Sequence, residues 1–491
     1  MGESSLKQKR RGMFAERVSG RNWSGCCLGN RKEEKMDKIE KQTFYRKLMG
    51  LVLPIALQQF LLACVSAADA LMLGYLDQDA MSAVSLAGQV TFVFNLFVAA
   101  LTIGGSMFAA QYWGKGEKSM VEEILGLILR VALLVSFLFT AAALFVPELL
   151  MGFFTKEPAL IVYGSQYLRI VSPSYLLCGA SQMYLCIMKN SGRAFQSTVI
   201  SGTMEAADIV MNLVLIYGLF GMPKMGVAGA ALSTVVAKAV ELLWAMADSR
   251  PSGRIHLRLS CLLHPDGELR RRFWKYTTPV LGNELVWGCG FAMYSVIMGH
   301  LGSDAVAANS VANVVKNLVV CVCLGIGTGG GILVGNELGA GALERAKRYG
   351  DKLCHFAIIA GAISGLVILF LIPVVRMMGM LTPSAQSYLD GMLVMCTYYM
   401  IGKSVNSTVI AGIFCAGGDS RFGFLCDAVT MWCVTVPLGF LSAFVVDLPV
   451  LAVFFIINLD EIVKLPAVYR HYKKYLWVND LTQKESAQPM Q

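Results

Sequence analysis

The stretch Gly74-Tyr-Leu-Asp-Gln-Asp-Ala-Met-Ser-Ala83 returns later in the chain as Gly299-His-Leu-Gly-Ser-Asp-Ala-Val-Ala-Ala308. An offset of 225 residues relates the two copies, and it continues on both sides without a gap. It pairs further residues as follows: Pro54 with Pro279, Gln59 with Glu284, Gly104-Gly105 with Gly329-Gly330, Gly114 with Gly339, and Gly116 with Gly341. Roughly a quarter of the aligned pairs are identical, which is far above chance for a register kept this long. The chain therefore contains an internal repeat.

The composition is that of a membrane protein. Of the 491 residues, 56% are hydrophobic and only 15% are charged. The apolar runs are about 20–25 residues long, enough to cross a bilayer as helices, and they are continuous, which argues against barrel strands. About twelve runs are predicted to be spans: residues 50–73, 84–112, 123–147, 163–188, 197–219, 226–248, 274–299, 306–335, 352–375, 388–415, 421–445 and 449–469. We expect an all-α membrane protein with two six-helix lobes, and such repeats are typical of secondary transporters.

The distribution of charge fixes the expected orientation. The net charge is +9, but Lys and Arg are concentrated in residues 7–47, 250–272 and 464–474, whereas the loops at 76–80 and 301–305 contain none. This alternation follows the positive-inside rule, which places both termini and the middle loop in the cytoplasm. The basic residues therefore indicate a lipid bilayer as partner and not a nucleic acid.

Span positions and charge together predict the domain organisation. Residues 1–47 are polar and basic and lack the apolar core of a signal peptide. We expect them to be disordered to about residue 35, and we expect the last dozen residues to be frayed. The predicted parts are: 1–47, a cytoplasmic basic extension; 48–248, the N-lobe with spans 1–6; 249–273, a cytoplasmic basic linker; 274–470, the C-lobe with spans 7–12; and 471–491, a cytoplasmic tail.

No motif predicts a cofactor or an enzyme. The 14 cysteines are scattered and form no CxxC pair, and no HExxH is present, so we expect no structural or catalytic metal site. The Thr328-Gly-Gly-Gly331 run lacks the lysine of a phosphate-binding loop and lies inside an apolar span. We therefore expect no direct use of ATP and no chemical step.

Five motifs resemble those of one transporter family. They are Pro54-Ile-Ala-Leu-Gln-Gln59, Asp69-Ala-Leu-Met-Leu-Gly74, Gln111-Tyr-Trp-Gly-Lys-Gly116, Gly226-Val-Ala-Gly-Ala-Ala231 and Gly417-Gly-Asp-Ser-Arg-Phe422. Together they resemble the multidrug and toxic compound extrusion (MATE) family, in the expected order over about residues 40–475. Within it, the sequence is most similar to the bacterial branch that includes the DNA-damage-inducible type.

The resemblance implies a V-shaped protein that opens alternately to each side of the bacterial inner (plasma) membrane. Such transporters export organic, mostly cationic and lipophilic compounds in exchange for protons or sodium ions. A monomer is sufficient, because two lobes are already fused in one chain.

Candidate ion-coupling residues are Asp69, Asp208, Asn212 and Glu284, because ionisable residues inside spans are costly and are usually functional. Asp69 matches the family's N-lobe acid, five residues before a glycine, and with Asp208 it is a possible Na⁺ ligand. Asp208 and Asn212 lie one helical turn apart. The family usually places Asn first, so the carboxylate here is displaced by about 5 Å, one turn. The alternatives are an interfacial acid for Asp69 and a structural hydrogen bond for Asp208.

Candidate substrate-cavity residues are polar or adaptable side chains inside spans: Gln58, Gln59, Lys316, Lys403, Asn406, Asp427, Tyr175 and Met183. Methionine and aromatic surfaces suit a promiscuous site for flat cations. We expect Glu284, Lys316, Lys403 and Asp427 to pair with one another, either as a coupling device or as a static network. Lys238 with Glu241, and the acids at 460–461 with Lys464, are expected to form local ion pairs.

Two alternatives remain open at this point. A lipid-linked oligosaccharide or cell-wall precursor flippase of the related superfamily is disfavoured by about twelve spans and mixed cavity charge, although Lys316 and Lys403 would suit it. A channel is disfavoured because duplicated halves favour alternating access and no selectivity filter is visible.

Overall fold

The structure is a computed structural model that describes residues 23–74, 78–263, 266–377 and 381–483. For residues 23–39, 66, 67, 69–71, 73, 74, 78–80 and 259 only the backbone is described. The chain divides into two compact units, Met1–Met49 and Gly50–Gln491. Disorder is predicted to about residue 35, and the part of this prediction at residues 1–22 lies outside the described residues. The first helix of the described residues begins at Trp23, so residues 23–35 are helical.

All regular elements of the described residues are helical. Before the middle loop they are α2 (Trp23–Gly74), α3 (Gln78–Lys115), α4 (Lys118–Phe145), α5 (Pro147–Phe154), α6 (Pro158–Asn190), α7 (Ala194–Tyr217), the 3₁₀ turn η1 (Leu219–Gly221) and α8 (Val227–Ser249). The middle loop contains α9 (Leu259–Leu263). After it come α10 (Gly267–His300), α11 (Ser303–Gly339), α12 (Leu343–Met377), α13 (Pro383–Asn406), η2 (Ser407–Phe414), α14 (Ser420–Ala428), η3 (Val429–Thr435), α15 (Val436–Phe440), η4 (Leu441–Val445), α16 (Val450–Ile457), α17 (Asp460–Val463) and α18 (Leu465–Tyr472).

Helix ends follow local capping chemistry. The Asp266 carboxylate accepts hydrogen bonds from the Glu268 and Leu269 amides at the start of α10, both 3.3 Å long. At the start of α13, the Thr382 hydroxyl accepts from the Ala385 amide at 3.1 Å. These side chains satisfy amides that the helix itself leaves free. Gly218 ends α7 in the left-handed conformation, with φ of 73°, which favours glycine because it has no Cβ atom.

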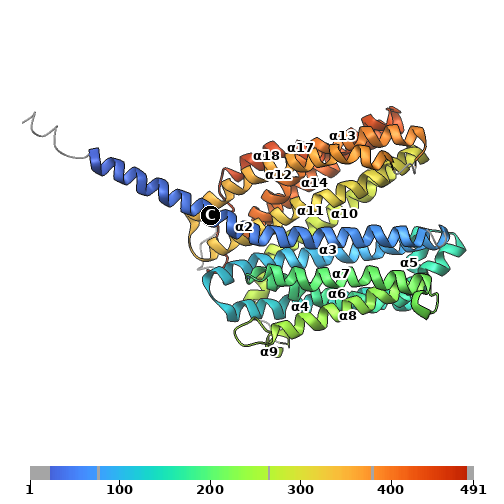
Figure 1. The fold of residues 1–491 in the computed structure, drawn as a ribbon, viewed down its shortest axis with the longest axis horizontal. Helices are drawn as coiled ribbons and strands as arrows, with labels where there is room; N and C mark the ends of the chain where they lie inside the picture. The colour runs from blue at the N-terminus through green and yellow to red at the C-terminus, as the bar shows by residue number, and fades with distance from the viewer. Residues whose placement is uncertain (1–22, 75–77, 264–265, 378–380, 484–491) are drawn as a thin grey trace, which may run out of the picture. The chain divides into compact units, whose positions relative to one another are not determined.

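The prediction of an all-α, two-lobe membrane fold is confirmed. Within Gly50–Gln491, helices α3, α4 and α6–α8 pack together as the N-bundle, and the helices from α10 to α18 pack as the C-bundle, with α3 contacting both α10 and α11 (Figure 1). Among the described residues, ten helices are long and apolar enough to cross a membrane. They coincide with ten of the twelve predicted runs, which makes about twelve spans plausible.

The other two predicted runs are occupied by interrupted helices. Residues 388–415 fall in α13, which continues as the π-helix η2. Residues 449–469 are divided among α16, α17 and α18. Three charged residues, Asp460, Glu461 and Lys464, lie at the α17 break, which explains why no continuous apolar helix forms there.

The internal repeat reappears as a two-fold relationship between the bundles. A Cβ atom added at Gly114 would overlap the Asn336 carbonyl, and one added at Gly339 would overlap the Gln111 carbonyl. Gly114 and Gln111 are the 225-residue equivalents of Gly339 and Asn336, so the two contacts are the same contact made twice. Small residues at such positions let two backbones approach closely. Helices α3 and α11 therefore cross at two glycines.

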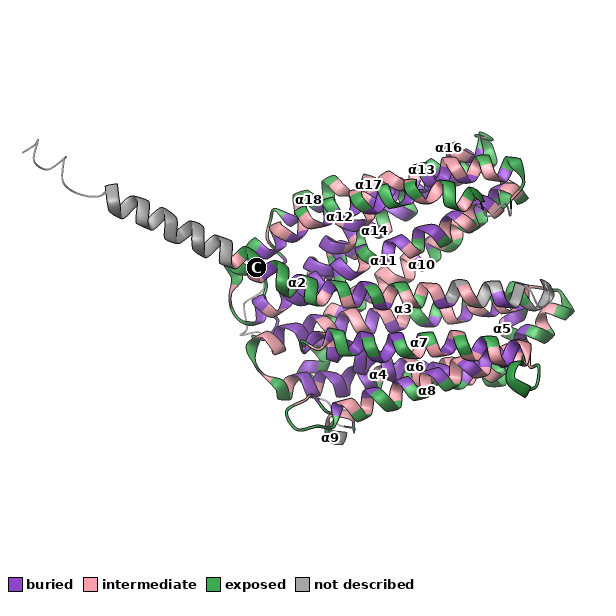
Figure 2. Cartoon of the chain, in the orientation of Figure 1, coloured by how far each residue is buried: buried purple, intermediate pink, exposed green. Residues whose placement is uncertain are grey.

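The outward surfaces of both bundles are apolar, as a lipid environment requires. In α4, Phe137 and Leu138 are 61% and 67% exposed, and in α12, Ile359 and Phe370 are 58% and 77% exposed. Figure 2 shows exposed residues alternating with buried ones along these helices. Exposed apolar surface of this extent is unusual for a soluble monomer and matches membrane-spanning helices.

The C-terminal tail is folded against the helices where it is described. Trp477 is fully buried, and Leu481 and Thr482 are almost so. Gly350 and Gly417 leave room for the indole ring and backbone of Trp477. The expectation of frayed final residues is therefore wrong at 481–482, because Leu481 bonds to Gln111 and Arg272 and Thr482 bonds to Asp480. Residues 484–491 lie outside the described residues.

The basic middle loop is attached to the N-bundle by ion pairs. Arg258 and His256 reach the Glu122 carboxylate of α4 at 2.7 and 3.1 Å, and Arg254 reaches Asp248 at 2.8 Å. Arg130 of α4 donates to the Leu263 carbonyl at 3.0 Å. These contacts fold the linker onto one end of the N-bundle.

Candidate functional site

Helix α7 presents two buried polar side chains one turn apart, as predicted. Asp208 is 3% exposed and Asn212 is fully buried. The Ser233 hydroxyl of α8 donates a short hydrogen bond to the Asn212 Oδ1 atom. The Asp208 Oδ1 atom is buried and makes no hydrogen bond with any described residue. A buried carboxylate oxygen without a donor is costly unless a proton or cation joins it.

A second polar cluster of the N-bundle is an ion-pair triad. The Lys238 ammonium of α8 lies 2.6 Å from a Glu205 oxygen of α7 and 2.9 Å from a Glu241 oxygen. All three side chains are at most 12% exposed. The predicted Lys238–Glu241 pair is confirmed, and Glu205 is an additional partner. One lysine between two carboxylates leaves the triad with an excess of negative charge when all three groups are ionised.

Asp69 lies in α2, but its side chain lies outside the described residues. Its neighbours Ala68 and Met72 pack with Ile209 of α7 in one apolar cluster. The Tyr217 hydroxyl donates to the Met72 carbonyl at 2.7 Å. The Asp69 turn of α2 therefore runs along the same α7 helix that presents Asp208.

The C-bundle contains a longer ion-pair network. Lys464 lies 2.8 Å from the Asp427 carboxylate and 3.1 Å from that of Glu461. Glu461 also pairs with Lys403 at 3.2 Å. Asn406 donates to both the carbonyl and the carboxylate of Glu461, at 2.7 and 2.8 Å. Most of these groups are nearly fully buried, so each member depends on its partners for solvation.

The expectation that Glu284, Lys316, Lys403 and Asp427 pair with one another is wrong. Lys403 and Asp427 find their partners on the interrupted last segment instead, and the local Glu461–Lys464 pair is confirmed. Glu284 and Lys316 form no ion pair within the described part of the chain. Spacing along one helix predicted the local pair, but the partners of Lys403 and Asp427 are set by packing between helices.

The two bundles repeat one arrangement of charges. In each, an acid (Glu205 or Asp427) pairs with a lysine (Lys238 or Lys464) in the last predicted span of its half, and that lysine also pairs with a glutamate three residues away. The order along the helix is reversed, because the glutamate follows the lysine in α8 and precedes it in α17. The C-bundle adds Lys403 as a fourth member. None of these residues is a 225-residue equivalent of its counterpart, so the similarity lies in the packing of the two bundles and not in the sequence repeat.

Interrupted helices surround the C-bundle network. Asn406 is the last residue of α13 before the π-helix η2, and Asp427 lies just before the π-helix η3. Glu461 and Lys464 flank the break between α17 and α18. π-Helical turns and broken spans are frequent at functional sites, because they free backbone groups and permit bending.

Lys316 occupies a different environment on α11. It is 9% exposed, and its ammonium lies 5.0 Å above the Tyr399 ring. Lys403 similarly lies 5.2 Å from the Trp287 ring, in addition to its ion pair. Both lysines therefore use aromatic faces as partners.

The remaining predicted cavity residues lie in the helix bundles. Gln58 of α2 is buried, its Oε1 atom has no partner among the described residues, and Gln59 is half-buried. Tyr175 and Met183 of α6 are buried in the N-bundle core. The Tyr175 hydroxyl lies 3.1 Å from the Thr91 hydroxyl, and its ring lies 5.0 Å from that of Phe94. A substrate-lining role for these four residues stays a prediction.

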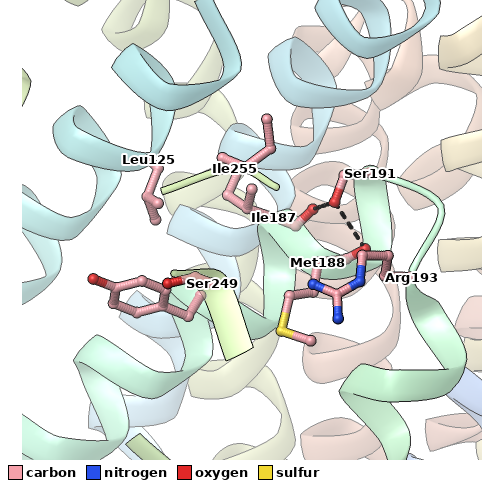
Figure 3. A pocket seen from close by; sticks show the side chains of 8 residues that line it. Leu125, Ile187, Met188, Ser191, Arg193, Ser249 and Ile255 are labelled. Carbon is pink, nitrogen blue, oxygen red and sulfur yellow. Dashed lines mark hydrogen bonds between the residues drawn. The ribbon is translucent and has the colours of Figure 1, made fainter. Parts of the chain in front are cut away.

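The cavity drawn in Figure 3 is too small for a substrate. It has a volume of about 10 Å³ and is lined by Leu125, Tyr184, Ile187, Met188, Ser191, Arg193, Ser249 and Ile255. Its polar lining includes the Ser191 hydroxyl, which donates to the Ile187 carbonyl at 2.8 Å, and the side chains of Arg193 and Ser249. A cavity of this size accommodates about one water molecule. No group of three or more His, Cys, Asp or Glu side chains that could hold a metal ion occurs among the described residues.

Comparison with known proteins accounts for the duplicated fold. The MatE family model matches residues 54–217 and again residues 279–441. The uncharacterized transporter YisQ of Bacillus subtilis (strain 168) is 22% identical over 450 residues, 91% of this chain and 98% of the relative. The probable multidrug resistance protein YoeA of the same strain is 24% identical over 451 residues, 90% and 96% of the two chains. A solved MOP superfamily transporter from Pyrococcus furiosus shares the fold, with a TM-score of 0.79 at 16% identity over 88% of this chain and 95% of that chain.

Proposed function

The chain belongs to the MatE family of multidrug efflux transporters, and from this premise we propose that it is a secondary antiporter. It exports organic, cationic and lipophilic compounds, drugs or metabolites, in exchange for protons or sodium ions. We propose that it works as a monomer in the inner (plasma) membrane, with both termini in the cytoplasm. The repeated bundles support alternating access, because the two bundles can change their contact without unfolding.

The observation that supports ion coupling most directly is the Asp208 carboxyl. It is buried within α7, and one of its oxygens lacks any donor among the described residues. Proton or sodium binding would remove the cost of this buried charge. Because the Asp69 turn of α2 packs along α7, neutralisation there changes the packing of α2 and α7. We propose that this repacking releases substrate to the outside.

Glu284 is proposed as a coupling carboxylate of the C-bundle. It is half-buried, and Trp287, three residues later on α10, has its ring 5.2 Å from the Lys403 ammonium. A cationic substrate or a proton at Glu284 would neutralise its charge and so change the electrostatic energy of the Lys403–Glu461–Lys464–Asp427 network. Gln58, Gln59, Lys316 and Asn406 are proposed as polar lining of the same path.

The test is efflux of a fluorescent lipophilic cation from proteoliposomes under an imposed proton or sodium gradient. The parent protein is expected to drive efflux with one gradient, and Asp208→Asn and Asp69→Asn are expected to abolish the gradient-driven part. Asp351→Asn, a half-exposed acid at the Tyr472 hydroxyl (2.9 Å), is the matched control and should retain transport. Equal efflux with and without either gradient would contradict antiport.

Lys316 favours a second candidate, the lipid-linked oligosaccharide or cell-wall precursor flippase. A buried lysine without an ion pair suits the phosphate of such a lipid. Translocation of a fluorescent polyprenyl-phosphate sugar by the same proteoliposomes, with no efflux of the cation, would establish this function in place of drug efflux.

A further inference from the structure

Helices α5 and α6 form a groove that the proposed transport path does not use. The groove has a volume of about 380 Å³, within the range of about 300–1,000 Å³ that is usual for sites of small ligands. Glu148 of α5 lines it together with residues from the first half of α6. Figure 1 shows α5 at the opposite end of the N-bundle from α9. Because α9 belongs to the basic middle loop, the groove lies on the side of the membrane away from that loop.

The surface around this groove is suited to contact with lipid. Val162, which lines the groove, and Leu149 and Phe153 of α5 are 65%, 73% and 86% exposed, and exposed apolar surface of this kind favours a bilayer over water. Arg169 comes six residues after the start of the predicted span 163–188, which is about 9 Å along the helix axis. At that depth a long basic side chain extends towards lipid headgroups.

The polar side of the groove carries one positive and one negative charge. The Arg169 guanidinium lies 2.6 Å from a Glu148 carboxylate oxygen, and both side chains are about half exposed. A guanidinium has five N–H donors and a carboxylate has about four acceptor positions, so each group retains capacity for a further partner. Gln166, which is exposed, shares one face of α6 with Val162 and Arg169, because residues three and four apart are neighbours on a helix.

Ser165 supplies independent evidence for a ligand. It lines the groove and is only 5% exposed, and its hydroxyl makes no hydrogen bond within the described part of the chain. Buried polar groups of native proteins are nearly always hydrogen-bonded, and one that is not indicates a water or a ligand. Ile161 and Ile170, both half-buried, supply the apolar lining beside it. The groove therefore combines hydrogen-bonding groups of both charges with an apolar wall.

We propose that the groove between α5 and α6 binds a phospholipid whose headgroup carries a phosphate and a primary ammonium, that is, phosphatidylethanolamine. The phosphate binds Arg169, whose guanidinium can bond two of its oxygens, and the ammonium donates to Glu148. A headgroup without an ammonium places its phosphate beside Glu148 with no charge to compensate it. The site is separate from the path of the exported compound, and its occupation does not depend on antiport.

The test measures binding of single phospholipids to the purified full-length protein in detergent by native mass spectrometry. Phosphatidylethanolamine, phosphatidylcholine and phosphatidylglycerol with the same acyl chains are compared. Phosphatidylcholine has no N–H donor for Glu148, and phosphatidylglycerol has no positive charge. The parent is expected to bind phosphatidylethanolamine about ten-fold more tightly than either, the size of one charge-assisted hydrogen bond.

Two variants separate the roles of the two charges. Arg169→Gln should weaken binding of all three lipids, and Glu148→Gln should remove the preference for phosphatidylethanolamine. Exposed ion pairs contribute little to stability, so both variants are expected to fold. Arg376→Gln is the matched control, because Arg376 is an exposed arginine paired with Asp390 in the C-bundle. It should bind phosphatidylethanolamine as tightly as the parent does.

Equal binding of the three lipids by the parent, or tighter binding of phosphatidylglycerol, would overturn the proposal. A preference for phosphatidylethanolamine that survives in Glu148→Gln, or that is lost in Arg376→Gln as well, would also overturn it. Lipid binding as expected but without gradient-driven efflux of a cation would leave the site in place and refute only the antiport.

Discussion

The backbone amide of Leu481 donates a 2.6 Å hydrogen bond to the side-chain oxygen of Gln111, 370 residues earlier in the chain. The amide nitrogen of Gln111 donates in turn to the carbonyls of Ala416 and Asn479, at 2.7 and 3.1 Å. One fully buried side chain of α3 thus connects the N-bundle to both the C-bundle and the tail. The equivalent residue of the second half, Asn336, has an Oδ1 atom without a partner among the described residues.

Replacing Gln111 should destabilise the protein. Gln111→Ala leaves the Leu481 amide and the Ala416 carbonyl without their partner, and each buried group left unsatisfied costs about 1–3 kcal/mol. We expect a lower Tm in detergent, measured by intrinsic fluorescence. Gln483→Ala, an exposed tail residue bonded to Asp480, is the control. Equal Tm values for the two variants would show that the tail does not stabilise the bundles.

The close crossing of α3 and α11 predicts that two equivalent glycine substitutions destabilise the protein to a similar extent. Gly114→Ala and Gly339→Ala should each force the two helices apart, because a Cβ atom would overlap a backbone carbonyl of the other helix. Overpacking of this kind typically costs about 1–3 kcal/mol. Gly88→Ala, also in α3 but with open space at its Cβ position, should leave the Tm unchanged. Similar Tm values for all three variants would contradict the close crossing.

The buried ion pairs predict that replacing Lys464 lowers the free energy of unfolding more than replacing Asp427 does. Lys464→Met leaves both Asp427 and Glu461 without this partner, and breaking a buried pair costs about 3–5 kcal/mol. Asp427→Asn removes one charge but leaves Lys464 paired with Glu461, so it should cost less. Chemical denaturation of the two variants measures the difference. The reverse order of stability would show that Lys464 is not the centre of the network.

Replacing Asp208 should abolish ion-driven efflux without lowering the stability of the protein. Asp208→Asn replaces a buried carboxylate whose oxygen lacks a donor, so we expect an unchanged or higher Tm. Ion-driven efflux should be lost, because Asn cannot bind a proton. Asp248→Asn is the contrasting control, since Asp248 pairs with Arg193 at 2.5 Å and Arg254 at 2.8 Å and should lose stability. A destabilised Asp208→Asn variant with normal efflux would assign Asp208 a structural role.

Local patterns predicted local features well. The i,i+3 pair Lys238–Glu241 and the Glu461–Lys464 pair follow from helical spacing, because residues three apart share a helix face. The second carboxylate partner of each lysine was not predicted. Glu205 and Asp427 come from other helices, and which faces of two helices meet depends on packing that one sequence does not display.

In the interrupted spans too, the sequence shows which residues are unusual, and packing decides what they contact. Asp460, Glu461 and Lys464 in one apolar run are visible in the sequence as an unusual cluster of charge. That α13 and α14 continue as π-helices beside this cluster, and that Lys403 and Asp427 reach it from those helices, is visible only in the tertiary structure. Sequence spacing therefore identified the residues but not their partners.

By itself, the sequence determined the helical membrane fold and the two-fold repeat, because apolar run length and a constant 225-residue register are properties of the chain alone. The family was indicated by the resemblance of short motifs and is shown by the family model that matches both halves. Only the tertiary structure decided which charges pair and where α3 and α11 cross, namely at Gly114 and Gly339. It also decided that the Leu481 amide bonds to Gln111. The physical reason is that a buried charge or amide must be satisfied by whatever group packing brings within bonding distance. Those groups lie up to 370 residues away along the chain.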